Sequence, residues 1–327
     1  MARTNTRTRR KRRTNQRVRL PIRSKTHRLN CSPAIKNSVS TESCFTPEIL
    51  MKIKDNYNKR HHSSAIQEND PKKIWHLLRE RLSCEREDCW LKEIGSSALR
   101  QQIKSYVFAP THPPEWNKNP DEWLSNFDIK DVAKQYETSN PEFKLIGPTT
   151  IDFDTRLPEN GKCVLEDLCT FSLDKFINAK KTKIGMVFNL DKHYQSGSHW
   201  VSLFVDIENH FLFYFDSADN DIPPEIWVKN GASKNKKGSQ TPLVNRLIEQ
   251  GKAHDIDFDF YTNEGNQHQK SNTECGMYSI FFITTLLTGK TPFTKGVMSV
   301  PSRINLFLKK KIPDKYMLEC RKIFFND

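Results

Sequence analysis

The sequence predicts an α+β fold, in which a helical N-terminal lobe precedes a β-rich core and a closing group of helices. Two observations indicate this order. Apolar residues recur at helical spacing between residues 44 and 106, and again from residue 274 to the end of the chain. Between these regions, apolar or alternating runs typical of strands are concentrated in residues 184–262.

The positive charge of the chain is concentrated at its N-terminus. Residues 1–30 contain ten arginines, two lysines and no acid, and so supply twelve of the thirteen net positive charges. The remaining residues carry 40 basic and 39 acidic side chains. This balance is that of an ordinary globular domain, and it excludes a protein that binds nucleic acid over its whole surface.

Residues 1–40 are predicted to form a disordered Arg-rich arm, because they offer almost no apolar surface to bury. The arginines of residues 1–30 are suited to nonspecific binding of nucleic acid, or to a nuclear-entry or packaging signal. A solvated tail that only improves solubility is the alternative.

No segment has the features of a membrane span or a secretory signal. The longest apolar run, residues 278–288, is about half of the roughly 20 residues that a spanning helix requires. We therefore expect a reducing compartment and eight free thiols. The pairs Cys84/Cys89 and Cys163/Cys169 lack the partners that a zinc site needs, so neither a metal nor another cofactor is expected.

Residues 41–110 are predicted to be the helical lobe, and residues 111–327 the catalytic domain. In the lobe, Asp70-Pro71 is a typical helix start, with a capping aspartate before a proline. Residues 107–124 are rich in proline and are expected to be a connector. Strands are expected at residues 184–190, 199–207, 210–217 and 256–262, with a turn at Glu208-Asn209, and helices at residues 129–136, 241–250, 274–287, 302–311 and 314–325.

Three residues lie at positions suited to thiol catalysis. His199 opens one expected strand, and Asp216 ends the strand that returns antiparallel to it, so both side chains should meet at one end of the hairpin. Cys275 lies at the start of an apolar helix, where free N–H groups and the helix dipole favour a thiolate. Each residue alone is more often structural, but nucleophile, base and orienting acid together are the set that thiol catalysis requires.

The spacing of these residues resembles a known family. His199-Trp200, then Phe-Asp-Ser at 215–217, then Gln269 six residues before Cys275-Gly276 resembles the ubiquitin-like-protein (SUMO) processing cysteine proteases and the related adenain. Trp123, Leu124 and Ile129 resemble a further segment of that family, with Asn126 where the family has an acid. Residues 115–290 carry the resemblance, which is strongest to the versions encoded by large cytoplasmic DNA viruses.

The resemblance implies a papain-like fold with a central mixed sheet flanked by helices. It also implies that Cys275, His199 and Asp216 form a catalytic triad, that Gln269 donates to the oxyanion, and that Trp123 and Trp200 wall a tunnel that admits glycines. His268 is an alternative candidate for the base, and Asp219 is an alternative candidate for the acid. Trp123 and Trp200 could instead be core residues without a role in substrate binding.

Three functions are compatible with the sequence. The first is a cysteine endopeptidase that cleaves after Gly-Gly-type sites and processes viral structural polyproteins, located in the virion and the host cytoplasm. The second is a deconjugase that removes ubiquitin-like modifiers in the cytoplasm or nucleus. The third is an inactive scaffold that binds nucleic acid through its arm. A polypeptide is the expected substrate in the first two cases, and no membrane partner is expected.

Overall fold

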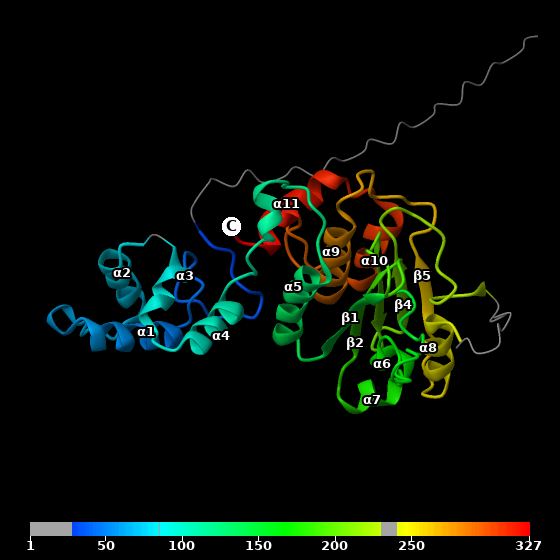
Figure 1. Cartoon of the computed structure of the whole chain (residues 1–327), viewed down its shortest axis with the longest axis horizontal. Coiled ribbons are helices and arrows are strands. Elements are labelled where there is room, and N and C mark those ends of the chain that lie inside the picture. The colour runs from blue at the N-terminus through cyan, green and yellow to red at the C-terminus, as the bar shows by residue number, and fades with distance from the viewer. Residues whose placement is uncertain (1–27, 85, 230–240) are drawn as a thin grey trace, which may run out of the picture.

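The computed structural model describes residues 28–84, 86–229 and 241–327 (Figure 1). A single five-stranded sheet has the order β1-β2-β3-β4-β5. β2, β3 and β4 pair antiparallel, whereas β1 and β5 each add a parallel edge, so the sheet is mixed, as the resemblance implied. The strands are β1 (Phe143–Thr150), β2 (Lys183–Asn189), β3 (Trp200–Asp206), β4 (Phe211–Phe215) and β5 (Asp259–Thr262).

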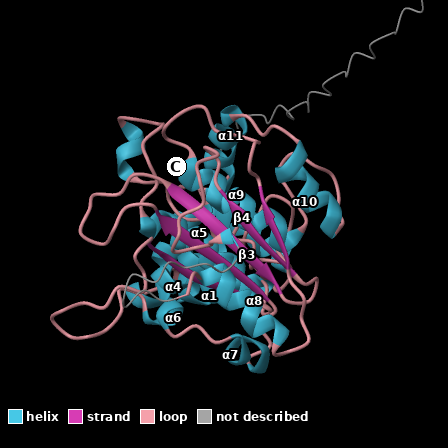
Figure 2. Ribbon diagram, turned by 90° about the vertical axis from the view of Figure 1, so that its right-hand side faces the viewer, coloured by secondary structure: helices cyan, strands magenta, loops and turns pink. Residues whose placement is uncertain are grey.

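Helices cover both faces of this sheet (Figure 2). Alternate residues of the central strands enter two separate apolar clusters, because successive side chains of a strand point to opposite faces. One cluster is shared with α5 (Asn126–Ser139), α9 (Cys275–Thr288), α10 (Val300–Lys309) and α11 (Asp314–Phe324). The other is shared with α6 (Glu166–Cys169), α7 (Leu173–Asn178) and α8 (Leu243–Lys252). The predicted α+β class is therefore confirmed.

The N-terminal helices form a third apolar cluster of their own, seen in blue and cyan in Figure 1. Their starts follow the capping rules, since Thr46 and Asp70 accept hydrogen bonds from the first turns of their helices and a proline follows each cap. The elements are α1 (Pro47–Arg60), α2 (Pro71–Arg81), α3 (Glu87–Trp90) and α4 (Ser97–Val107), with short 3₁₀ turns at His62–Ser64, Leu91–Glu93 and, in the connector, Pro114–Asn117.

Residues 28–40 differ from the sequence expectation. They were placed in the disordered arm, but Leu29, Ser32 and Val39 are buried. Asn30 and Asn326, near the first and last of the described residues, hydrogen-bond to each other through backbone and side-chain groups. The few apolar residues of this segment thus find partners far away in sequence, which local composition does not reveal. The rest of the predicted arm, residues 1–27, lies outside the described residues.

The cysteines also differ from expectation, because six of the eight form disulfides. The pairs are Cys31–Cys44, Cys84–Cys89 and Cys163–Cys169. The prediction of free thiols rested on compartment and spacing, whereas the fold brings these sulfurs together in pairs. Cys275 and Cys320 are the free cysteines of the described part of the chain, and both are buried. None of the described helices is long and apolar enough to cross a bilayer.

Candidate active site

The central hairpin brings His199 and Asp216 together. His199 directly precedes β3, and Asp216 directly follows β4. Ser202 pairs with Phe215 in the antiparallel register, so the start of β3 and the end of β4 lie at the same edge of the sheet. The connection between the strands spans residues 207–210 and includes the predicted turn residues Glu208 and Asn209. The two side chains meet, with His199 Nε2 2.6 Å from Asp216 Oδ1.

The carboxylate of Asp216 is held by several further donors. It is 1% exposed and accepts hydrogen bonds from the backbone N–H of Ala218 and from both the backbone and the side chain of Asn220. Burial raises the pKa of Asp216, but the hydrogen bonds from His199, Ala218 and Asn220 and the charge of His199 outweigh burial and lower it. Asp216 is therefore an ionised acceptor that fixes the orientation of the imidazole.

His199 links this carboxylate to the thiol of Cys275. Burial lowers the pKa of His199, but hydrogen bonds to Asp216 and Cys275, together with their charges, raise it to about 10. Since Nε2 faces Asp216, Nδ1 is the nitrogen available to the sulfur. The raised pKa favours an imidazolium at His199, which can take and return the proton of a cysteine nucleophile.

Cys275 is the first residue of α9, a helix that is buried on nearly every side. The N–H of a first helical residue has no acceptor within the helix, so it is available to an anion. The following residue is Gly276, and a Cβ at this position would lie 3.0 Å from the Cβ of Leu124. Glycine lets α9 pack closely against the segment that begins α5.

Gln269 lies near this helix start with its amide held at both ends. Its Nε2 donates to the carbonyl of Ser271, and its Oε1 accepts from the hydroxyl of Ser217 at 2.7 Å. An amide nitrogen carries two protons, so one remains for an oxyanion. Ser217 also accepts the backbone N–H groups of His268 and Gln269 at its carbonyl. The residue after the acid therefore fixes the loop that carries the candidate oxyanion donor.

The two tryptophans predicted to wall a tunnel differ in their exposure. Trp200 is 8% exposed, belongs to the apolar cluster of α9, and donates from its indole nitrogen to the carbonyl of Leu124. Trp123 is 36% exposed. The hydrogen bond of Trp200 to Leu124 places it beside the residue that follows Trp123, and Leu124 in turn lies next to Gly276.

The alternative acid and base have structural partners. His268 is buried between the carbonyl of Phe307 at Nε2 and the N–H of Ile312 at Nδ1. Burial lowers the pKa of His268 to about 4, although its hydrogen bond to Phe307 acts in the opposite direction. Asp219 accepts the backbone N–H of Gly265. Neither residue is among the hydrogen-bond partners of Cys275 or His199.

Two residues of this region have no signal in the sequence. Asn263 accepts the N–H of Asp216 and donates to its carbonyl, although 47 residues separate them. Glu274 lies directly before Cys275, buried, and pairs with Arg321 of α11 at 2.9 Å. The contacts of both residues depend on the folded chain, so spacing alone could not find them.

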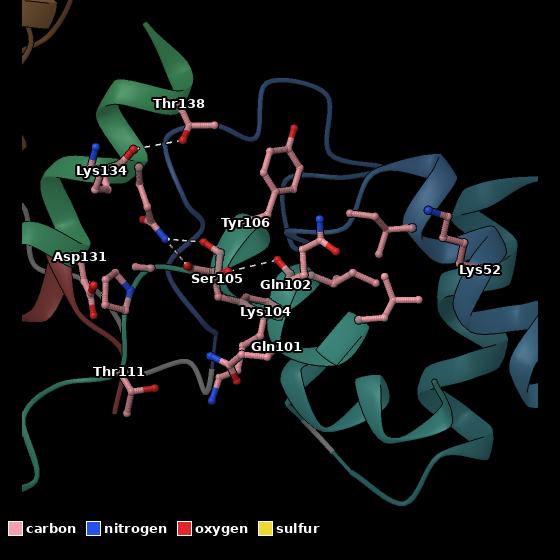
Figure 3. Close-up of a pocket in the computed structure, with 17 residues that line it drawn as sticks. Lys52, Gln101, Gln102, Lys104, Ser105, Tyr106, Thr111, Asp131, Lys134 and Thr138 are labelled. Atoms are coloured by element: carbon pink, nitrogen blue, oxygen red, sulfur yellow. Dashed lines mark hydrogen bonds between the residues drawn. The ribbon is translucent and has the colours of Figure 1, made fainter. Parts of the chain in front are cut away.

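A pocket of about 830 Å³ lies away from these residues, between α4 and α5 (Figure 3). Its lining includes Lys104 and Lys134 and none of the candidate catalytic residues. Among the described residues, Cys163, Glu166 and Cys169 are the group close enough to hold a metal. The two sulfurs of this group are joined in a disulfide, so they are not free to bind an ion.

The site and fold define a class, the thiol peptidases with a papain-like layout, in which a cysteine at a helix start faces a histidine on the neighbouring sheet. Comparison with known proteins supports this class. Residues 172–322 match the model of the Ulp1 protease family, C-terminal catalytic domain. The matched residues include His199, Asp216, Gln269 and Cys275, and the chain is a cysteine peptidase.

Individual relatives come from large DNA viruses. The chain is 29% identical over 241 residues to a protein of Acanthamoeba polyphaga mimivirus that is named as a thiol protease, covering 74% of this chain and 69% of the relative. It is 24% identical over 229 residues to a cysteine protease of African swine fever virus, covering 64% and 75%. A crystal structure of an African swine fever virus protease shares the fold, with a TM-score of 0.55 at 20% identity over 91% of this chain and 95% of that one.

Proposed function

We propose that the chain is an endopeptidase that cleaves after Gly-Gly-type sites, with Cys275 as nucleophile, His199 as acid and base, Asp216 as orienting acid and Gln269 as oxyanion donor. The observation that carries this proposal is the 2.6 Å contact between Asp216 and His199, together with the effect of Cys275, at the start of α9, on the pKa of His199. An inactive scaffold would have no need for a buried thiol joined to an imidazole and a carboxylate.

The reaction follows from this geometry. His199 takes the proton of the Cys275 thiol, and the thiolate attacks the scissile carbonyl carbon. The carbonyl oxygen becomes an oxyanion that accepts from the free N–H of the Gln269 amide and from the N–H of Cys275. His199 then gives its proton to the leaving amine, and the acyl group remains on sulfur as a thioester. Water, deprotonated by His199, attacks the thioester, and the acid product leaves as the thiol re-forms.

The burial of the thiol supports glycine specificity. Cys275 is 1% exposed, and Trp200 beside His199 is also buried. In this proposal, the substrate brings its carbonyl carbon to the sulfur between Trp200 and Trp123. Only residues without a side chain pass easily, so two glycines before the scissile bond suit the site.

Processing of structural polyproteins in the virion and the host cytoplasm is the biological setting that we propose, because relatives of this chain are viral proteases. Removal of ubiquitin-like modifiers is the second candidate. Relatives from other isolates of African swine fever virus are named SUMO-1 cysteine proteases, which favours testing it. The arm of residues 1–30 is proposed to contact nucleic acid nonspecifically, because of its twelve positive charges.

One assay separates the two candidates. The protein is incubated with a Gly-Gly-X peptide spanning a scissile bond, and separately with a SUMO whose C-terminal glycines carry a fluorogenic group. A Gly-Gly-X peptide is expected to be cleaved at the higher kcat/KM, and Cys275→Ser is expected to cleave neither. Faster turnover of the SUMO substrate would favour the deconjugase, and cleavage that persists in Cys275→Ser would reject the proposed nucleophile.

A further inference from the structure

A buried arginine on α11 reaches the residue next to the catalytic cysteine. Arg321 is 5% exposed, and each of its three side-chain nitrogens donates. Nε and Nη2 bind the two carboxylate oxygens of Glu274 at 3.0 and 2.9 Å, a bidentate pairing. Nη1 donates to the carbonyls of Pro120 and Glu122 at 3.1 and 2.7 Å. The guanidinium carbon also lies 4.3 Å from the centre of the Trp116 ring.

These contacts hold two separate segments of the proposed site. Glu274 directly precedes Cys275, and Nη2 of Arg321 also reaches the carbonyl of Thr273 at 3.4 Å. Glu122 directly precedes Trp123, the exposed wall of the proposed substrate approach. The planar guanidinium of Arg321 therefore bridges the start of α9 and the segment before Trp123. Its fork of N–H donors holds the distance between them more rigidly than a lysine ammonium would.

The pairing also controls charge beside the thiol. Glu274 is buried, and an unbalanced carboxylate next to Cys275 would oppose ionisation of the sulfur. Burial raises the pKa of Glu274 above its usual value, although the hydrogen bonds and charge of Arg321 lower it and so favour the ionised form. The groups that face Glu274 are Arg321 and Cys320 of α11, Asp121 of the connector and Tyr278 of α9. The groups that face the thiol are His199 and, through it, Asp216.

We infer that Arg321 is a positioning residue for peptide hydrolysis, which sets the distance between Cys275 and the Trp123 wall and balances the charge of Glu274 beside the nucleophile. This inference rests on the proposed function, since it assumes that Cys275 attacks the substrate. It does not make Arg321 a catalytic residue, because Arg321 acts through Glu274 and the carbonyls of the connector.

The test compares three changes that separate charge from geometry. Arg321→Met leaves Glu274 unbalanced, Arg321→Lys keeps the positive charge without the fork, and Arg321→Met combined with Glu274→Gln removes both charges. Each variant is assayed for kcat and KM on a Gly-Gly-X peptide and for thermal unfolding. The rate at which iodoacetamide alkylates Cys275 is also measured by peptide mass spectrometry as a function of pH, and the midpoint of that pH profile is compared between variants. Arg303→Lys is the matched control, because Arg303 also binds backbone carbonyls, those of Met298 and Leu286.

The expected results differ between the variants. Arg321→Met should move the alkylation midpoint about one pH unit higher, as an uncompensated neighbouring charge does. Arg321→Lys should keep the native midpoint but lower kcat/KM about tenfold, mainly through KM, because the Trp123 wall is displaced. The double variant should show the native midpoint with the same loss of kcat/KM. If Arg321→Met does not fold, the lysine and double variants carry the test.

The inference is overturned if all Arg321 variants keep the native midpoint and lose no more kcat/KM than Arg303→Lys, or if activity is lost only in proportion to the unfolded fraction. Cys275→Ser is measured beside them. If Cys275→Ser is inactive while the Arg321 variants behave like the control, the inference fails and the proposed function stands. If Cys275→Ser still cleaves the peptide, the proposed function itself fails.

Discussion

Replacement of Ser217 by alanine tests how the candidate oxyanion donor is held. The Ser217 hydroxyl donates to Gln269 Oε1 at 2.7 Å, and both side chains are buried. Without this donor the amide oxygen of Gln269 is left without a hydrogen bond, which costs about 1–3 kcal/mol of unfolding free energy. The amide then loses one of the two contacts that orient it.

The two hydrogen bonds of the Gln269 amide also limit how much activity Ser217→Ala can lose. Complete loss of an oxyanion donor costs about 10²–10³-fold in kcat. Gln269 Nε2 still donates to the carbonyl of Ser271 in Ser217→Ala, so the amide keeps part of its orientation. Loss of one neutral hydrogen bond, about 1.4 kcal/mol, corresponds to about a tenfold fall in kcat, which is the expected result.

Ser202→Ala is the matched control, because the hydroxyl of Ser202 is buried in β3 and has no hydrogen-bond partner among the described residues. Both variants are assayed for kcat on a Gly-Gly-X peptide, for alkylation of Cys275 by iodoacetamide and for urea unfolding. Alkylation forms no oxyanion, so its rate should stay native in both. The reasoning is refuted if Ser217→Ala loses no more kcat than Ser202→Ala, or if alkylation slows in parallel with kcat.

Three further outcomes are expected. Trp123→Ala and Trp200→Ala should each lower kcat/KM for a Gly-Gly substrate and allow more cleavage of a Gly-Ala substrate, so the ratio of the two kcat/KM values is measured. If the variants lose thermal stability but keep the native ratio, both tryptophans are core residues. Deletion of residues 1–27 should leave peptide hydrolysis nearly unchanged and abolish binding to duplex DNA at low salt, measured by fluorescence anisotropy; retained binding would place the basic surface elsewhere. Because the pKa of His199 is raised to about 10 and that of Asp216 is lowered, the stability difference between the native chain and Asp216→Asn should be full between pH 3.8 and pH 6.5. It should shrink as pH rises towards 10, measured by urea unfolding, and a constant difference over that range would contradict the ion pair.

The strongest periodic patterns predicted the fold well. The helix expected at residues 274–287 is α9, Cys275–Thr288, and the strand expected at 184–190 is β2, Lys183–Asn189. β1 had not been expected, because Gly147-Pro148 interrupts its apolar run. The structure keeps the strand by placing it at the sheet edge with an irregularity between Ile146 and Thr149, where the missing proline N–H does least harm.

The sequence predicted some residues of the candidate site and missed others, for a physical reason. His199, Asp216 and Cys275 lie at strand and helix ends, and such positions can be inferred from patterns along the chain. Asn263 and Arg321 act through contacts that cross 47 or more residues, so no local pattern marks them. The placement of Asn30 depends on the same kind of distant contact, because it hydrogen-bonds to Asn326.

The most direct test of the catalytic assignment is covalent labelling by a peptide that ends in Gly-Gly followed by a vinyl sulfone, with the modified residue identified by mass spectrometry. The probe is expected to modify Cys275 alone, to stop peptide hydrolysis at one equivalent, and to react far more slowly with His199→Gln. Cys320, the other free cysteine of the described chain, provides an internal control because it is equally buried. Modification of Cys320 in place of Cys275, or continued hydrolysis after Cys275 is fully modified, would contradict the assignment.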